Sequence, residues 1–144
     1  LSVLALGGFY SDADTICLKP LSAWTGPHNA SEINIIVGVE MDSIGREDWP
    51  KWFAREFQIT QWSFAARAGH PVLQDVANRI VALAPDMIAK GKLSADDIFN
   101  WTGPGVFTDA VLSYLERDYG TSWRTDLHKK SKSLVIGDLL LLTV

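Results

Sequence analysis

Apolar positions along the chain fall into short runs in some segments and into a helical period in others. The run 33–40, INIIVGVE, is largely apolar over the length of one strand, which is typical of a strand buried on both faces. The aromatic and β-branched stretch 9–18 predicts extended structure, and 133–144 predicts two short strands about a turn at Gly137–Asp138. We expect 9–14 and 33–40 to be neighbouring strands of one sheet.

Helical periodicity is clearest in segment 71–84, where Pro71 suits the first turn of a helix. We expect this helix to pack on the sheet through one apolar face, which carries Val72, Val76, Ile80 and Leu83.

Three further helices are indicated by their end signals. Residues 1–6 are apolar and are followed by two glycines, which is typical of a helix end. Ser94 with Asp97 forms a capping-box pattern, and 103–120 begins and ends in glycine. Because strands and helices alternate, we expect an α/β fold.

Composition narrows the function classes. A length of 144 residues fits one domain or part of one, with a net charge of −4 and six tryptophans that suit a core or a sugar-binding cleft. The chain has no basic run interleaved with aromatics, so nucleic acid is not an expected partner. The single cysteine, Cys17, excludes an internal disulfide, and its apolar neighbours predict a buried thiol.

Both ends of the sequence lie in apolar runs, so we expect residues 1–144 to be part of one longer catalytic domain. No signal peptide is recognisable, and the final LLLLTV is too short to span a bilayer. Any membrane attachment would then use a segment outside these residues.

The motif Asp12-Ala13-Asp14 is the main candidate for chemistry. In extended backbone, residues two apart face the same side, where two like charges repel unless a cation or water lies between them. Carboxylates suit hard ions such as Mg²⁺ or Mn²⁺, whose remaining positions would go to water, a third ligand or substrate phosphates. The alternative is a turn whose aspartates cap nearby amides.

Two other families use similar patterns. A calcium loop is excluded because Ile16 and Cys17 stand where oxygen ligands and glycine are needed. A phosphohydrolase of the haloacid dehalogenase type would use Asp12 as nucleophile and Asp96–Asp97 as a later metal pair, although Ile16 occupies its usual Thr or Val position.

The string GGFYSDADTICLKPL resembles the D-x-D signature of glycosyltransferase family 32. Four later strings resemble the fungal initiation-specific α-1,6-mannosyltransferase group, in the same order. They are GVEMD, FQITQWSFAARAGHPVLQDV, WTGPGVFTDAVLSYL and VIGDLLLL.

The resemblance implies a GT-A-like (Rossmann-like) glycosyltransferase domain that binds GDP-mannose and a divalent metal, usually Mn²⁺, with Mg²⁺ as an alternative. It implies α-1,6 transfer of mannose to an N-glycan core in the Golgi lumen, by a single-pass membrane protein. Another acceptor, such as inositol-phosphoceramide, is left open. By the family pattern Asp14 binds the metal directly, and Asp12 contacts the ribose or the metal shell. The linkage retains the donor configuration, for which front-side attack needs no protein nucleophile.

Further candidates lie along the matched strings. The proposed sugar pocket contains Gln61, Trp62, Thr102, Gly103 and Asp109. Core packing is the alternative for Gln61 and Trp62, and an aspartate in the first turn of a helix is the alternative for Asp109. Glu40 and Asp42 follow a strand, where they could line an acceptor site or face water, and His70 suits an N-cap.

By the same resemblance, the N-terminal nucleotide-binding half precedes Leu1 and a further metal ligand follows Val144. We therefore expect these residues alone not to transfer mannose, and a non-catalytic truncated relative remains a third hypothesis. Asn29 and Asn100 lie in glycosylation acceptor patterns, which would suit a lumenal protein.

Overall fold

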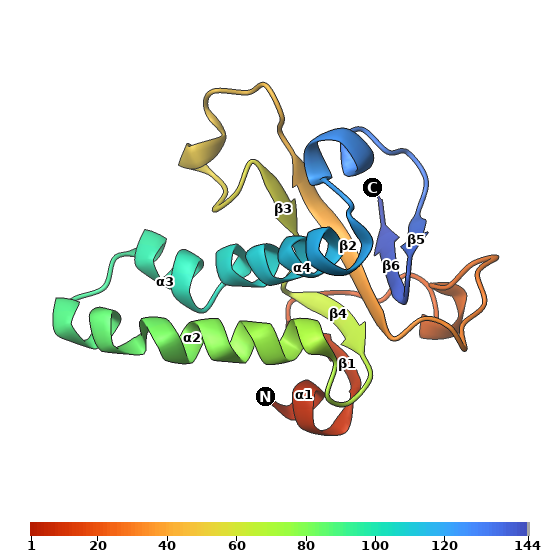
Figure 1. The fold of residues 1–144 in the computed structure, drawn as a ribbon, viewed down its shortest axis with the longest axis horizontal. Coiled ribbons are helices and arrows are strands. Elements are labelled where there is room, and N and C mark those ends of the chain that lie inside the picture. Colours follow the sequence, from red (N-terminus) through yellow and green to blue (C-terminus); the bar gives the residue numbers. More distant parts are fainter. Residues whose placement is uncertain (144) are drawn as a thin grey trace.

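A mixed sheet of six strands forms the centre of the structure, a computed structural model that describes residues 1–143 (Figure 1). The strand order is β1-β4-β2-β6-β5, with β3 paired to the far end of β2. Strands β2 and β6 are parallel, and the other pairs are antiparallel. The strands are β1 (Gly8–Ser11), β2 (Ile35–Asp42), β3 (Phe57–Ile59), β4 (Ser63–Ala66), β5 (Leu134–Ile136) and β6 (Leu139–Leu142).

Helix α4 (Pro104–Tyr119) crosses the sheet, and α2 (Pro71–Lys90) lies beside it (Figure 1). The short helix α3 (Ala95–Trp101) precedes α4 and packs against its beginning, and α1 (Ser2–Leu6) leads into β1. These elements confirm the α/β class.

The core lies between α4 and one face of the sheet. Helix α4 buries a broad apolar stripe, while β2 buries Ile35 and Val37 on the same side. Burial of such side chains contributes about 1.5–3 kcal/mol each. The stripe on α4 consists of Val106, Phe107, Ala110, Val111, Tyr114 and Leu115.

The opposite face of β2 is not sealed. Ile36 and Gly38, which alternate with the buried residues, are only partly buried and line a cavity. The prediction of a strand buried on both faces is therefore wrong, because a period of two places half of this apolar run on the cavity side.

Strand β4 lies between β1 and β2, pairing with both in antiparallel fashion. The prediction that β1 and β2 are neighbours is therefore wrong. Strands of three and four residues give little periodic signal, which is why neither β3 nor β4 is predicted from the sequence.

Helix α2 is longer than predicted and packs mainly on α4. Its first turn joins the core through Val72 and Leu73, but Leu83 is 38% exposed and the helix continues through Pro85 to Lys90. Only the beginning of the predicted apolar face therefore meets the sheet side of the core.

The signals at element ends were reliable. Gly7 ends α1, Ser94 and Asp97 form the complete capping box of α3, and Gly120 ends α4 in the left-handed conformation. His70 is the N-cap of α2, where its Nδ1 accepts from the Val72 amide at 3.2 Å. Strands β5 and β6 flank the predicted turn at Gly137–Asp138, while Val144, in the predicted second strand, lies outside the described residues.

Within residues 1–143, no helix is both long enough and apolar enough to cross a membrane.

Gly105 permits the close approach of α4 to α3. A Cβ at this position would lie 2.9 Å from the Phe99 carbonyl oxygen and 3.1 Å from Asn100 Cα. Gly105→Ala should therefore destabilise the chain by about 1–3 kcal/mol in urea unfolding. Alanine otherwise favours helix, so unchanged or increased stability would contradict this contact. Gly38→Ala, whose Cβ would meet its nearest atom at 3.4 Å, is the control.

Candidate functional site

The D-x-D motif lies in a turn directly after the edge strand β1. The amide of Asp12 donates to the Trp62 carbonyl at 2.9 Å, which ties the motif to the connection between β3 and β4. The Asp12 carbonyl in turn accepts from the Thr15 amide at 3.2 Å and from the Thr15 hydroxyl at 2.7 Å. Extended structure thus ends at Ser11, and the prediction of extended backbone through the motif is wrong.

The two carboxylates have different surroundings. Asp12 is partly buried, and its Oδ1 accepts a hydrogen bond from the Tyr10 hydroxyl at 2.6 Å, which raises the pKa of Tyr10. Asp14 is exposed at the turn. The same-side argument does not apply to them, because alternation with a period of two belongs to extended backbone.

A cavity of about 570 Å³ adjoins the turn. Asp12 lines it together with Trp62, and Asp14 is not among its lining residues. Its floor is the open face of the sheet, with Ile36 and Gly38. Because this cavity lies beside the D-x-D turn, we call it the turn cavity.

Cys17 also lines the turn cavity, and it is exposed. The prediction of a buried thiol is therefore wrong. The apolar residues beside it, Ile16 and Leu18, are exposed as well, so the run that suggested burial lies on the surface.

A second cavity, of about 330 Å³, contains three of the other predicted residues, Gln61, Thr102 and Gly103. Tyr10 lines this second cavity and is hydrogen-bonded to Asp12 in the turn cavity, while Gln61 and Trp62 are successive residues that line one cavity each. The two cavities therefore meet at one shared wall.

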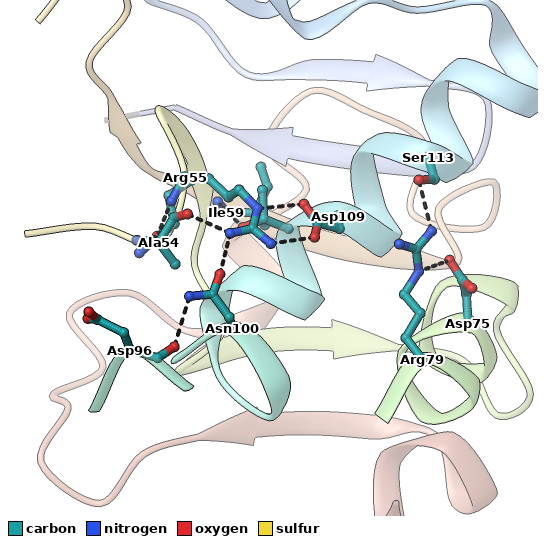
Figure 2. Close-up of polar contacts among 11 residues, drawn as sticks. Ala54, Arg55, Ile59, Asp75, Arg79, Asp96, Asn100, Asp109 and Ser113 are labelled. Carbon is teal, nitrogen blue, oxygen red and sulfur yellow. Dashed lines mark hydrogen bonds and ion pairs between the residues drawn. The ribbon is translucent and has the colours of Figure 1, made fainter. Parts of the chain in front are cut away.

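Asp109 lies in neither cavity. Its two oxygens accept from Arg55 Nε at 2.7 Å and Arg55 Nη2 at 2.5 Å, in a partly buried fork that raises the pKa of Arg55 (Figure 2). Asp109 is in the second turn of α4 rather than the first, so the interpretation as a helix N-terminal acid is wrong. The carboxylate holds Arg55 against α4.

Arg55 also binds Asn100 on α3, through Nη1 and Asn100 Oδ1 at 2.5 Å (Figure 2). The Asn100 amide nitrogen donates to the Asp96 carbonyl at 2.8 Å. Both ends of this side chain are therefore hydrogen-bonded. The same holds for Asn29, which donates to Glu32 and accepts from Ser31, and both asparagines are exposed.

A chain of hydrogen bonds links this fork to the turn cavity. Glu40 accepts from Trp62 Nε1 at 3.4 Å and from Gln58 Nε2 at 2.9 Å, and Gln58 Oε1 accepts the amides of Ala54 and Arg55. Sequence reasoning missed Gln58 and Arg55. A glutamine within a strand that is otherwise apolar was the available signal, because a buried amide requires partners.

Asp42 is the last residue of β2 and, like Glu40, accepts hydrogen bonds from other parts of the chain. It accepts from His128 Nδ1 at 2.8 Å and from the Lys129 amide at 2.7 Å. Burial acts to raise the pKa of Asp42, but these two donors, the electrostatic effect of His128 and the Ile44 amide together lower that pKa. The carboxylate fastens the segment before β5 to β2.

A second polar cluster lies under the β5–β6 turn. Asp138 accepts from the Tyr114 hydroxyl at 2.6 Å and from Asn34 Nδ2 at 2.8 Å. His70 is 3% exposed, and its Nε2 lies 3.4 Å from Asp138 Oδ2 without a well-formed hydrogen bond. Burial lowers the pKa of His70, against the opposing effect of Asp138. This cluster joins α2, α4 and β6.

The geometry expected of a phosphohydrolase is absent from residues 1–143. Asp12 follows an antiparallel edge strand rather than a central parallel one. Asp97 is occupied by the capping box and by Lys90, which approaches to 2.5 Å. The two acid groups therefore do not form one site.

The carboxylates of the D-x-D turn suit a metal ion whose remaining ligands come from water and from a bound phosphate. Among residues 1–143, no group of three or more His, Cys, Asp or Glu side chains is placed to hold an ion. One or two carboxylates with water and phosphate oxygens are, however, the usual environment of Mg²⁺ beside a nucleotide. Asp12 and Asp14 are the carboxylates available at this turn, and Asp12 Oδ2 accepts no hydrogen bond from the described part of the chain.

Three proteins similar to this chain are all named initiation-specific alpha-1,6-mannosyltransferase. The chain is 37% identical to the initiation-specific alpha-1,6-mannosyltransferase of Schizosaccharomyces pombe, over 100% of the chain and 37% of that protein. It is 36% identical to the Candida albicans protein of the same name, over 80% of the chain and 33% of that protein. For the Saccharomyces cerevisiae protein of that name the identity is 27%, over 80% of the chain and 38% of that protein.

The chain thus spans about a third of the length of these relatives. No family model matches the chain, and no solved structure matches it. The chain is therefore similar to about a third of each of these mannosyltransferases.

The buried histidine predicts a pH dependence of stability. Burial holds the folded-state pKa of His70 below its ordinary 6.5. Between these two values the unfolded chain therefore binds more protons than the folded chain. The unfolding free energy should therefore fall as the pH is lowered from 7 through 6.5 towards the folded-state value. His70→Asn keeps a capping acceptor and should flatten this slope in urea titrations at several pH values.

His28→Asn removes a histidine outside the cluster and serves as the control. A slope that persists unchanged in His70→Asn would assign the pH dependence to another group.

Proposed function

We propose that this chain is the D-x-D region of a metal-dependent mannosyltransferase that takes GDP-mannose and extends an N-glycan core by an α-1,6 mannose. The observation that supports it best is the turn cavity, where Asp12 and Trp62 meet in a chain similar to enzymes of that name. The assignment to a GT-A-like domain and to the Golgi lumen, in a protein with one membrane span, belongs to the same proposal.

The donor diphosphate would lie at the D-x-D turn. Asp14, exposed at the turn, would hold the divalent ion, and the free Oδ2 of Asp12 would accept a ribose hydroxyl or complete the metal shell. Tyr10 and the Trp62 carbonyl fix Asp12 from two sides, so the carboxylate is oriented before substrate arrives. The bound Mn²⁺ or Mg²⁺ would neutralise charge on the departing diphosphate.

Transfer breaks the bond between mannose C1 and the diphosphate oxygen and forms a bond from C1 to the acceptor hydroxyl oxygen. The acceptor proton leaves with the diphosphate, which keeps the reaction balanced without a protein nucleophile. Trp62 presents an exposed ring at the shared wall, and Gln61, Thr102 and Gly103 offer polar groups beyond it for the sugar or the acceptor.

Removing one D-x-D charge tests the proposed site. Asp14→Asn in the active enzyme should lower kcat/KM about a hundredfold or more, because it removes a hard ligand and keeps the shape. Asp12→Asn should act in the same direction. The measurement is mannose transfer from GDP-mannose at saturating Mn²⁺, with Asp86→Asn on the exposed side of α2 as the charge-matched control. Near-normal turnover of Asp14→Asn would contradict the proposal.

The exposed thiol in the turn cavity reports on donor binding. GDP with Mn²⁺ should slow the alkylation of Cys17 by N-ethylmaleimide severalfold, because the nucleotide would cover the cavity that the thiol lines. The modified peptide is followed by mass spectrometry, with Mn²⁺ alone as the control. An alkylation rate that nucleotide leaves unchanged would exclude donor binding at this cavity.

A further inference from the structure

A third surface cavity combines aromatic rings with unused polar groups. It has a volume of about 260 Å³ and lies between the turn that begins at Trp49 and the exposed side of α3. We call it the aromatic cleft. Its walls include Trp49, Trp52, Phe53 and Phe99, together with Lys51 and Asp96.

Two of the aromatic rings of the cleft are open to solvent. Trp52 is 70% exposed and Phe99 is 49% exposed, although each could be buried at a substantial gain in free energy. Large apolar side chains gathered at an exposed hollow indicate a surface that binds something.

The polar groups of the cleft restrict what that occupant can be. Within residues 1–143, the indole N–H groups of Trp49 and Trp52 donate to no protein acceptor, and Lys51 and Asp96 make no ion pair through their side chains. An apolar helix laid on the rings would leave these charges without partners. A hydroxyl-rich ring with apolar faces would cover the aromatics and satisfy donors and acceptors around its edge.

The two walls of the cleft are held at a fixed separation by the Arg55 fork. Arg55 Nη1 donates to the Ala54 carbonyl at 2.6 Å and to Asn100, and its other nitrogens bind Asp109 (Figure 2). This guanidinium therefore fastens the segment that carries Trp49 and Trp52 to both α3 and α4. A cleft whose walls are joined by hydrogen bonds before binding has less conformational freedom to lose when a ligand enters.

The cleft is also connected to the proposed transfer site. The Ala54 and Arg55 amides bind Gln58, which is linked through Glu40 to Trp62 in the turn cavity. In the sequence, α3 supplies Phe99 to the cleft, and Thr102, which lines the second cavity, directly follows the last residue of α3. A branched oligosaccharide bound at the cleft would have to pass the end of α3 to reach the second cavity.

We propose that the aromatic cleft binds one sugar ring of the glycan acceptor, away from the hydroxyl that receives mannose. A volume slightly below the roughly 300 Å³ of small drug-sized pockets suits a single ring. The identity of this ligand as the acceptor rests on the proposed function, whereas saccharide binding at the cleft does not require metal or nucleotide.

The test uses the active enzyme and a free high-mannose N-glycan core as the acceptor probe. Trp52→Ala should raise the acceptor KM about tenfold and leave kcat and the KM for GDP-mannose unchanged. Trp52→Phe should recover most of the affinity, because it restores an aromatic face. Ile88→Ala, an exposed apolar truncation on α2, is the control and should change neither KM.

Equilibrium binding separates this proposal from the proposed function. Calorimetry of the same oligosaccharide without donor should show weaker binding to Trp52→Ala than to the parent enzyme, also in an Asp14→Asn background. If Asp14→Asn abolishes transfer and Trp52→Ala leaves acceptor binding unchanged, the transferase proposal stands and the cleft proposal is wrong. If Asp14→Asn transfers normally, the proposed function fails, and the calorimetry still decides whether the cleft binds saccharide.

The association state of Trp52→Ala, measured by analytical ultracentrifugation, provides a further test of the proposal. If Trp52→Ala changes the association state of the enzyme and not its oligosaccharide affinity, the cleft is a protein contact.

Discussion

The packing of α4 on the sheet is the interaction on which the other features depend. The helix buries Val111 and Leu115 completely against strands that come from both halves of the chain. Within the same interface the Thr108 hydroxyl accepts the Ile59 amide at 3.0 Å, so that a polar contact fixes the helix relative to β3. An interior packed this closely has few alternative arrangements, and the position of α4 therefore sets the positions of what precedes it.

The position of α4 also fixes the surface residues that contact its first turns. Gly103 and Gly105 let α3 approach closely, and Asp109 projects from the helix to meet Arg55. One partly buried guanidinium then connects two helices to the segment before β3. Removing either partner of such a fork leaves the other charge without compensation. The main role of the fork is therefore to fix the positions of α3, α4 and the segment before β3, rather than to add stability.

The same arrangement explains why the outer face of the sheet remains open. The helices cover one side of β2, and the D-x-D turn lies beside the other, where Gly38 presents no side chain to fill the space. A cavity bordered by a turn that carries charge on one side and by Trp62 on the other suits a ligand with phosphate and sugar parts. The shape of this surface thus supports the mannosyl transfer proposed above, as do the names of the relatives.

The sequence by itself determined the elements whose signals are local. The capping box at Ser94, the glycine that ends α4 and the turn at Gly137–Asp138 all act through backbone geometry within a few residues, and each was predicted correctly. The D-x-D string and its resemblance were also visible without coordinates. Tertiary structure alone decided the order of the strands, because β3 and β4 are too short to show a period and pair with distant partners.

Tertiary structure also decided the partners of the polar residues. Nothing in the local sequence joins Arg55 to Asp109, or His70 to Asp138, since these pairs form only when α4 and β6 have packed. For the same reason Asp109 lies outside both cavities and Cys17 lines one of them, although the residues around each suggested the opposite. Local patterns specify backbone conformation, whereas the surroundings of a side chain are set by which segments the core brings together.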